Sequence, residues 1–317
     1  MLSWEERRQL VKTASLYYID GLTQEQIAKK IGVSRPVISK NLQKAKDYGI
    51  VEVFIKDESL HTVELEKKLE EAFKLDNAIV VPTMGYSSEM RKKTVGQAAA
   101  NFVTKNLKRR KTIGISWGTT LAALVREFPF IRDEQIRVVP LVGGMGGEQV
   151  DIHANQLAYE LAKKFNGTCS YLYVPAIIET NELKELLVNM YDVNSVLEAG
   201  QKVDMALVGI GNPYQHSILR EVGYISDEDI EEFRKAGAVG DISSRFVNID
   251  GKPVDHSINE KVIGITLEQL KEIPIVIGVA EGVNKVESIL GALNGEYLNV
   301  LVIDEETAAA VLEKKGA

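Results

Sequence analysis

Residues 111–128, KTIGISWGTTLAALVREF, join a β-branched run to a helix-forming segment through a glycine. The run TIGIS has the length of a buried strand, Gly118 interrupts it, and the apolar spacing after Thr119 favours a helix. A strand that is apolar throughout and is followed at once by a helix is typical of a parallel sheet covered on both faces. This stretch therefore predicts an α/β fold.

The same alternation continues over most of the chain. We expect a doubly wound, mostly parallel α/β domain over residues 57–317, with 57–62 as a linker. A helix from Val63 is expected to pack against this domain. The expected strands cover residues 78–81, 112–116, 137–142, 170–178, 204–210, 274–280 and 298–303.

Residues 1–56 show a different pattern, with three short helical segments. Capping-box pairs at Ser3 and Glu6 and at Thr23 and Gln26 predict two helix starts, and Gly32 predicts a tight turn before a third helix over 34–48. This spacing predicts a helix-turn-helix domain, with residues 50–55 as a candidate wing strand. The side chains expected to face inward are Leu10, Val11, Ala14, Tyr17, Tyr18, Ile27, Ala28, Ile31, Val33, Ile38 and Leu42.

Charge is distributed unevenly along the chain. Residues 1–56 hold ten Lys or Arg and six Asp or Glu, a net charge of +4, so the whole-chain charge of −7 leaves −11 for the rest. A basic module on an acidic body suits local binding to DNA, although surface composition alone or a solvated polar face would look similar. The residues expected to contact DNA are Thr23, Gln24, Ser34, Arg35, Pro36, Ser39 and Lys40.

Several features indicate the compartment. The N-terminal residues MLSWEERRQL show no basic and apolar leader, and apolar stretches stay far below the roughly 18 residues of a membrane span. Cys169 has no second cysteine to pair with. We expect a cytosolic protein without a membrane span or an internal disulfide.

Four strand-to-helix junctions are rich in glycine and polar side chains: 116–120, 142–156, 207–217 and 278–289. Small molecules bind beyond the carboxyl ends of parallel strands, where such loops meet. SWGTT predicts a phosphate site, because glycine admits a ligand and a helix start offers free amides. His153 and Asn155 suit sugar hydroxyls, and Lys285 suits an anion.

Each junction also has a purely structural interpretation. Thr119 can be an N-cap, Gly118 a turn residue and His153 a residue with a protein partner. Asp241 and Arg245, in the stretch GAVGDISSRF, can form an exposed ion pair. The residues by themselves leave these alternatives open.

Five motifs in order, LTQEQIAKKIGVSRPVISKNLQKA, SWGTT, the VGG run, AVGDISSRF and GVAEGVNKVESILGAL, span essentially the whole chain. Together they resemble the SorC-type, DeoR-like bacterial transcriptional regulators, in particular the deoxyribonucleoside-regulator branch. The resemblance implies a sugar-binding domain related in fold to sugar-phosphate isomerases, a phosphorylated sugar as effector, and dimers or tetramers on operator DNA. We expect no catalytic residue, metal or cofactor.

By position, the resemblance implies effector contacts from Ser116, Trp117, Gly118, Thr119, Thr120, Gly143, Gly144, Met145, His153, Asn155, Asp241, Arg245 and Lys285. Two positions depart from the family pattern. The deoxyribonucleoside branch has a lysine able to form an imine directly before its glycine pair, whereas Val142 stands here and disfavours deoxyribose phosphate. Glu281 replaces a glycine of many relatives and predicts a narrower or more acidic pocket.

These observations predict a DNA-binding regulator, a repressor of a carbohydrate-utilisation operon, whose operator affinity follows the phosphorylated sugar. One alternative is an isomerase-like enzyme carrying a DNA module, with Asp241, His153 or Glu281 as base, but the sequence shows no compact acid–base pair. A constitutive DNA-architectural protein would leave the glycine and threonine loops unexplained.

Overall fold

The computed structural model describes residues 2–51, 60–107, 110–144 and 149–316. The chain divides into two compact units, Met1–Leu60 and His61–Ala317. Each unit has a hydrophobic core of its own. The predicted boundary between residues 56 and 57 lies outside the described residues.

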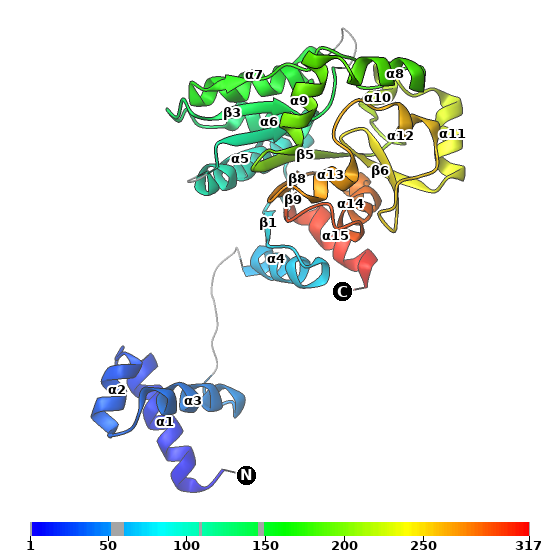
Figure 1. Cartoon of the computed structure of the whole chain (residues 1–317). Coiled ribbons are helices and arrows are strands. Elements are labelled where there is room, and N and C mark those ends of the chain that lie inside the picture. The colour runs from blue at the N-terminus through cyan, green and yellow to red at the C-terminus, as the bar shows by residue number, and fades with distance from the viewer. Residues whose placement is uncertain (1, 52–59, 108–109, 145–148, 317) are drawn as a thin grey trace. The chain divides into compact units, whose positions relative to one another are not determined.

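The first unit consists of α1 (Trp4–Tyr18), α2 (Gln24–Ile31) and α3 (Arg35–Asp47) (Figure 1). Capping boxes at Ser3 and Thr23 begin α1 and α2, as predicted. Gly32 ends α2 with φ 80°, a conformation that glycine adopts without steric cost, and a three-residue turn leads into α3. Ser34 occupies the N-cap position of α3, but its side chain makes no capping hydrogen bond.

Ile38 and Leu42 of α3 pack with Ile27 and Ala28 of α2 in the core of this unit, as the spacing predicted. In α1 the prediction was partly wrong, because Val11 is 48% exposed and Tyr18 is 42% exposed. Thr13 is buried instead, and its hydroxyl donates to the Gln9 carbonyl, so a polar residue fits the core face. The spacing of apolar residues cannot identify such a threonine as part of the core.

The candidate wing begins at Ile50 and Val51, whose amides both donate to the Ala45 carbonyl and so belong to the end of α3. The rest of that segment, residues 52–55, lies outside the described residues.

The second unit is built on a sheet with strand order β1-β9-β8-β5-β2-β3-β4, and every neighbouring pair along this path is parallel. This arrangement confirms the predicted doubly wound α/β architecture (Figure 1). The strands are β1 (Asn77–Val81), β2 (Thr112–Ile115), β3 (Arg137–Pro140), β4 (Thr168–Cys169), β5 (Met205–Gly211), β8 (Val276–Val279) and β9 (Val300–Asp304).

Alternate residues of β1, β5 and β9 enter two separate cores, which explains why these strands are apolar throughout. In β5, Met205 and Leu207 join one core while Ala206 and Val208 join the other. The first core is covered by α5 (Ser88–Asn106), α6 (Thr119–Glu127) and α7 (Ala154–Phe165). The second is covered by α4 (Leu60–Phe73), α9 (Tyr191–Gln201), α13 (Leu267–Lys271), α14 (Val286–Asn294) and α15 (Glu305–Lys315).

The connections contain short elements: η1 (Val150–Ile152), α8 (Asn181–Val188), α10 (Ile218–Glu221), α11 (Asp227–Lys235), α12 (Ser257–Lys261) and η2 (Val283–Lys285). They also contain an antiparallel hairpin that the sequence did not predict, formed by β6 (Ala238–Ile242) and β7 (Arg245–Asn248). Ser243 and Ser244 make its two-residue turn with φ 52° and 66°, the left-handed pair typical of a type I′ turn. β6 pairs in turn with the end of β5.

Two predicted boundaries were wrong. The expected strand over 170–178 is absent among the described residues beyond Cys169, because Pro175 has no amide and the Leu172 amide donates to a side chain of α7. The expected linker ends early, since residues 60–62 already belong to α4. The buried Leu65 and Leu69 of α4 confirm its packing against the second unit.

Candidate functional site

A cavity of about 640 Å³ lies at the carboxyl ends of the central strands. β2 leads to β3 on one side of the sheet whereas β5 leads to β8 on the other, so the strand order reverses between these neighbours. Ligands of doubly wound proteins bind at such a switch point. The lining comprises residues 88, 91, 92, 116–121, 149, 209–212, 215–219, 221, 241, 243 and 281–285.

The start of α6 supplies backbone amides to this cavity. Gly118, not Thr119, is the N-cap, and it has no side chain to occupy the first amides of the helix. Its φ of 127° and ψ of 163° suit glycine alone, and a Cβ there would meet nothing within 4 Å. Both Thr119 and Thr120 line the cavity. Free amides at the positive end of a helix dipole form a ready anion site.

Two buried serines face the same space without a protein partner. Ser116 is 1% exposed and Ser243 is 3% exposed, and neither hydroxyl has a hydrogen-bond partner among the described residues. Buried hydroxyls are nearly always hydrogen-bonded in native proteins. A polar ligand in the cavity would supply the missing hydrogen bonds to both hydroxyls.

The β6–β7 hairpin contacts the loop before α6 and places the Asp241 carboxylate in the cavity lining. The Trp117 indole donates to Ser244 Oγ at 3.1 Å, and Asp241 stands opposite Gly211 in the pairing of β6 with β5. A Cβ at Gly211 would lie 1.9 Å from Asp241 Oδ1, so glycine is required there. Burial raises the pKa of Asp241 to about 6, although the Ser244 amide and Lys285 oppose this shift.

Lys285 follows β8 and lines the cavity near Glu281. Burial lowers the pKa of Lys285, and the Glu281 carboxylate opposes the shift. Glu281 lines the cavity, and two cations face it: its carboxylate lies 4.0 Å from Arg91 Nε and 3.8 Å from Lys92 Nζ. The predicted effect of Glu281 on the width and acidity of the pocket stays a prediction.

Arg91 and Lys92 also line the cavity, although the sequence did not predict them there. They lie in the first turns of α5, which follows β1, and the rule that ligands gather after parallel strands applies to this junction as well. The junction between β1 and α5 was not among the predicted sites because it has no glycine-rich loop. Asn212 and His216, which belong to the third glycine-bearing junction, do line the cavity.

The first unit presents a polar face on α3. Ser34, Arg35, Pro36, Ser39 and Lys40 are all exposed, whereas Ile38 and Leu42 are buried. Thr23 is engaged in its capping box and Gln24 is half-buried. An exposed polar stretch of this kind is compatible with the recognition helix of a helix-turn-helix, and DNA contact by these residues stays a prediction.

Residues 57–313 match the family described as "Putative sugar-binding domain". The chain is 32% identical to the sorbitol operon regulator of Klebsiella pneumoniae over 98% of this chain and 99% of that protein. The crystal structure of that full-length regulator, SorC, matches with a TM-score of 0.76 over 97% of this chain and 99% of that one. The chain belongs to this family of sugar-binding transcriptional regulators.

Other relatives agree. The deoxyribonucleoside regulator of Bacillus subtilis (strain 168) is also 32% identical, over 97% of this chain and 98% of that protein. A DeoR family transcriptional regulator from Listeria monocytogenes is 44% identical, with a TM-score of 0.74 over 79% of this chain and 99% of that one. These relatives support a regulatory rather than an enzymatic role. None of the described helices has the length and apolar composition needed to cross a bilayer.

The Gly-Gly loop of the regulator does not line the cavity in the described residues. A Cβ at Gly143 would lie 2.5 Å from the Val174 carbonyl oxygen, so this glycine admits backbone rather than ligand. Gly144 makes two backbone hydrogen bonds with the segment 174–176 of the same chain: its amide donates to the Val174 carbonyl, and its carbonyl accepts from the Ala176 amide. Met145 lies outside the described residues, and Val142 is fully buried.

Asn155, His153 and Arg245 also lie outside the cavity lining. The Asn155 side chain bonds both backbone groups of Leu172, and His153 is the buried N-cap of α7. The structural alternative of an exposed ion pair between Arg245 and Asp241 is absent from the described structure. Instead Arg245 donates to the carbonyls of Asn259, Val262, Gly264 and Ile265, and burial lowers its pKa to about 10.

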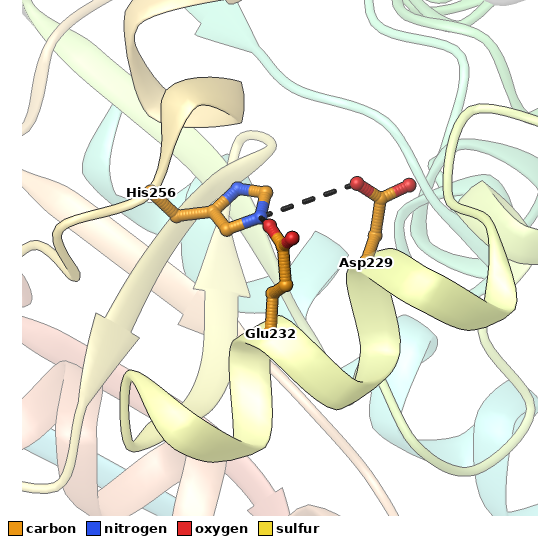
Figure 2. A group of neighbouring side chains, drawn as sticks. All are labelled: Asp229, Glu232 and His256. Atoms are coloured by element: carbon orange, nitrogen blue, oxygen red, sulfur yellow. Dashed lines mark hydrogen bonds and ion pairs between the residues drawn. The ribbon is translucent and has the colours of Figure 1, made fainter.

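Figure 2 shows Asp229, Glu232 and His256 close together, the kind of group that can hold a metal. His256 Nδ1 accepts a hydrogen bond from the Ile258 amide, so Nε2 carries the proton and donates to Glu232 at 2.9 Å. That proton occupies the position a metal would need. The group caps α12 and joins it to α11.

Proposed function

We propose that this regulator is a repressor of a carbohydrate-utilisation operon whose affinity for operator DNA is controlled by a phosphorylated sugar in the cavity. The effector binds noncovalently, with no cofactor or metal, and the protein acts in the cytoplasm as a homo-oligomer. The observation that carries this proposal is the start of α6, which has no side-chain cap, beside two buried serine hydroxyls that have no hydrogen-bond partner in the part of the chain that the structure describes. Backbone amides and hydroxyls of this kind suit a phosphate.

The rest of the lining suits the sugar. Asp241 can accept hydrogen bonds from hydroxyls, and Asn212 and Gln215 add amides, of which Asn212 is already held by the Asn284 carbonyl. Lys285 and Lys92 add positive charge. Paired copies of α3 would read two operator half-sites, so an effector that favours one arrangement of subunits changes DNA affinity, typically by about 1–3 kcal/mol.

The effector half is tested by thermal-shift measurements on the full chain. The compounds are glucose 6-phosphate, fructose 6-phosphate, ribose 5-phosphate and deoxyribose 5-phosphate, with glucose as the matched control that lacks the phosphate. At least one phosphate ester should raise Tm while glucose does not. Equal effects of glucose and its phosphate would exclude the phosphate site.

The DNA half is tested on an operator selected from random DNA with the full chain. Arg35→Ala should weaken specific binding by about 1–3 kcal/mol if the guanidinium reads a base, whereas Lys12→Ala on α1 removes the same charge and should have a smaller effect. Equal losses in both variants, measured by gel shift, would show that Arg35 reads no base. Adding the stabilising sugar phosphate should then release wild-type protein from the operator.

A further inference from the structure

Arg91 joins the cavity to a surface helix. Its Nε faces Glu281 Oε2 at 4.0 Å, and both residues line the cavity. Its Nη1 donates to Glu306 Oε2 at 2.8 Å, and Glu306 lies in the first turn of α15, outside the lining. One guanidinium therefore connects a cavity carboxylate with the start of α15.

A second link joins the same two places. Asp304 is fully buried and N-caps α15, accepting the Thr307 amide at 3.0 Å and its hydroxyl at 2.6 Å. The same carboxylate accepts the Gly282 amide at 2.8 Å, and Gly282 belongs to the cavity loop that carries Lys285. A displacement of that loop therefore acts directly on the first turn of α15.

The first turn of α15 also contacts the beginning of the second unit. Glu305 Oε1 lies 3.6 Å from His61 Nε2, and His61 is the second residue of α4. The chain runs from the helix-turn-helix unit through residues 52–59 directly into α4. The start of α4 is thus the first part of the sugar-binding unit that a signal toward the DNA-binding unit must reach.

We propose that Arg91 is a positioning residue that transmits occupancy of the cavity through the first turn of α15 to the start of α4. The guanidinium is free to respond, because Nε is buried without a hydrogen-bond partner among the described residues and 4.0 Å from Glu281 is too long for one. An anion in the cavity competes with Glu306 for Arg91. The weakened contact changes the α15 turn and the His61 contact. This inference rests on the proposed anion site.

The test measures amide hydrogen exchange of residues 60–66 in the full chain, with and without saturating inorganic phosphate. In wild type, phosphate should change the exchange rate at least twofold. Glu306→Gln removes the competing carboxylate, so it should bind phosphate at least as tightly as wild type and show the phosphate-bound exchange rate in both conditions. Glu313→Gln, at the other end of α15, is the matched control and should behave like wild type.

His61→Gln adds a second readout: exchange at residues 305–309 should still respond to phosphate, while residues 62–66 should not. A full wild-type response in Glu306→Gln, or bound phosphate without any change at α4 in wild type, would overturn the relay and leave the proposed function intact. Absence of phosphate binding in wild type contradicts the phosphate site itself, and the relay falls with it.

Discussion

Two glycine-bearing junctions of the sheet resemble each other in sequence and differ in structure. The loop at 116–120 opens onto the cavity, and its Gly118 leaves open space where a Cβ would stand. The loop at 142–144 is closed by neighbouring backbone, and a Cβ at Gly143 would collide with two carbonyl oxygens. Glycine in such a loop thus leaves either open space beside a cavity or room for a close backbone contact.

The β6–β7 hairpin repeats this contrast within five residues. Asp241 lines the cavity, whereas Arg245 binds backbone carbonyls beyond it. Arg245 pairs with Ile242, the neighbour of Asp241, so the side chains of Asp241 and Arg245 point to opposite faces of the hairpin. Variants can separate the residues that face ligand from those that hold the fold.

The largest expected effect is at Arg245. Arg245→Met should lower the free energy of unfolding by about 3 kcal/mol or more, because buried carbonyls lose a charged donor. Urea unfolding measures the loss, with the exposed Lys235→Met as control. A stable variant that fails to bind sugar phosphate would instead make Arg245 an effector contact.

Gly143 and Gly144 can be compared directly, with Gly144→Ala as the control for Gly143→Ala. Gly143→Ala should cost about 2–3 kcal/mol, because the added methyl meets the backbone of Val174 and Pro175. Gly144→Ala should cost under about 1 kcal/mol, since the nearest atom to its Cβ is 3.9 Å away. Equal stabilities in thermal and urea unfolding would contradict the packing assigned to this loop.

Asp241→Asn should stabilise the unliganded protein above pH 6. The folded pKa of Asp241, about 6, is raised above the ordinary value of 3.8, so the folded state binds its proton more tightly and wild-type stability falls as pH rises between these values. The variant does not titrate at this position. Its free energy of unfolding, relative to that of wild type, should therefore be about 1–3 kcal/mol higher at pH 8 than at pH 4. Exposed Asp255→Asn is the control. If the difference in unfolding free energy between Asp241→Asn and wild type did not change with pH, the raised pKa of Asp241 would be contradicted.

The smallest effect on stability is expected at Ser116. Ser116→Ala should leave unliganded stability within about 0.5 kcal/mol, because the hydroxyl has no partner in the described structure, yet weaken sugar-phosphate binding roughly tenfold. Ser288→Ala removes a hydroxyl that donates to the Val239 carbonyl at 2.7 Å and should show the reverse pattern. Calorimetric titration and urea unfolding distinguish the two, and unchanged affinity in Ser116→Ala would remove it from the site.

Local sequence signals predicted much of this protein because their physics acts within a few residues. Capping boxes, the αL glycine after α2 and apolar strand runs depend on neighbouring backbone groups alone. The cations Arg91 and Lys92 escaped prediction because they reach the cavity through contact between helices. A Cβ at Gly96 would lie 2.7 Å from backbone atoms of α6, so glycine lets α5 approach and brings its first turns to the site.

The sequence by itself therefore determined the two-part organisation, the three helices of the first unit, the parallel sheet and the glycine-bearing loop after β2. Only the tertiary structure decided which polar residues face the cavity. Whether Asp241 or Arg245, Gly118 or Gly143, lines the cavity depends on strand order and on pairings between distant segments, such as β6 with β5 and residue 144 with 175. Local propensity carries no information about those partners.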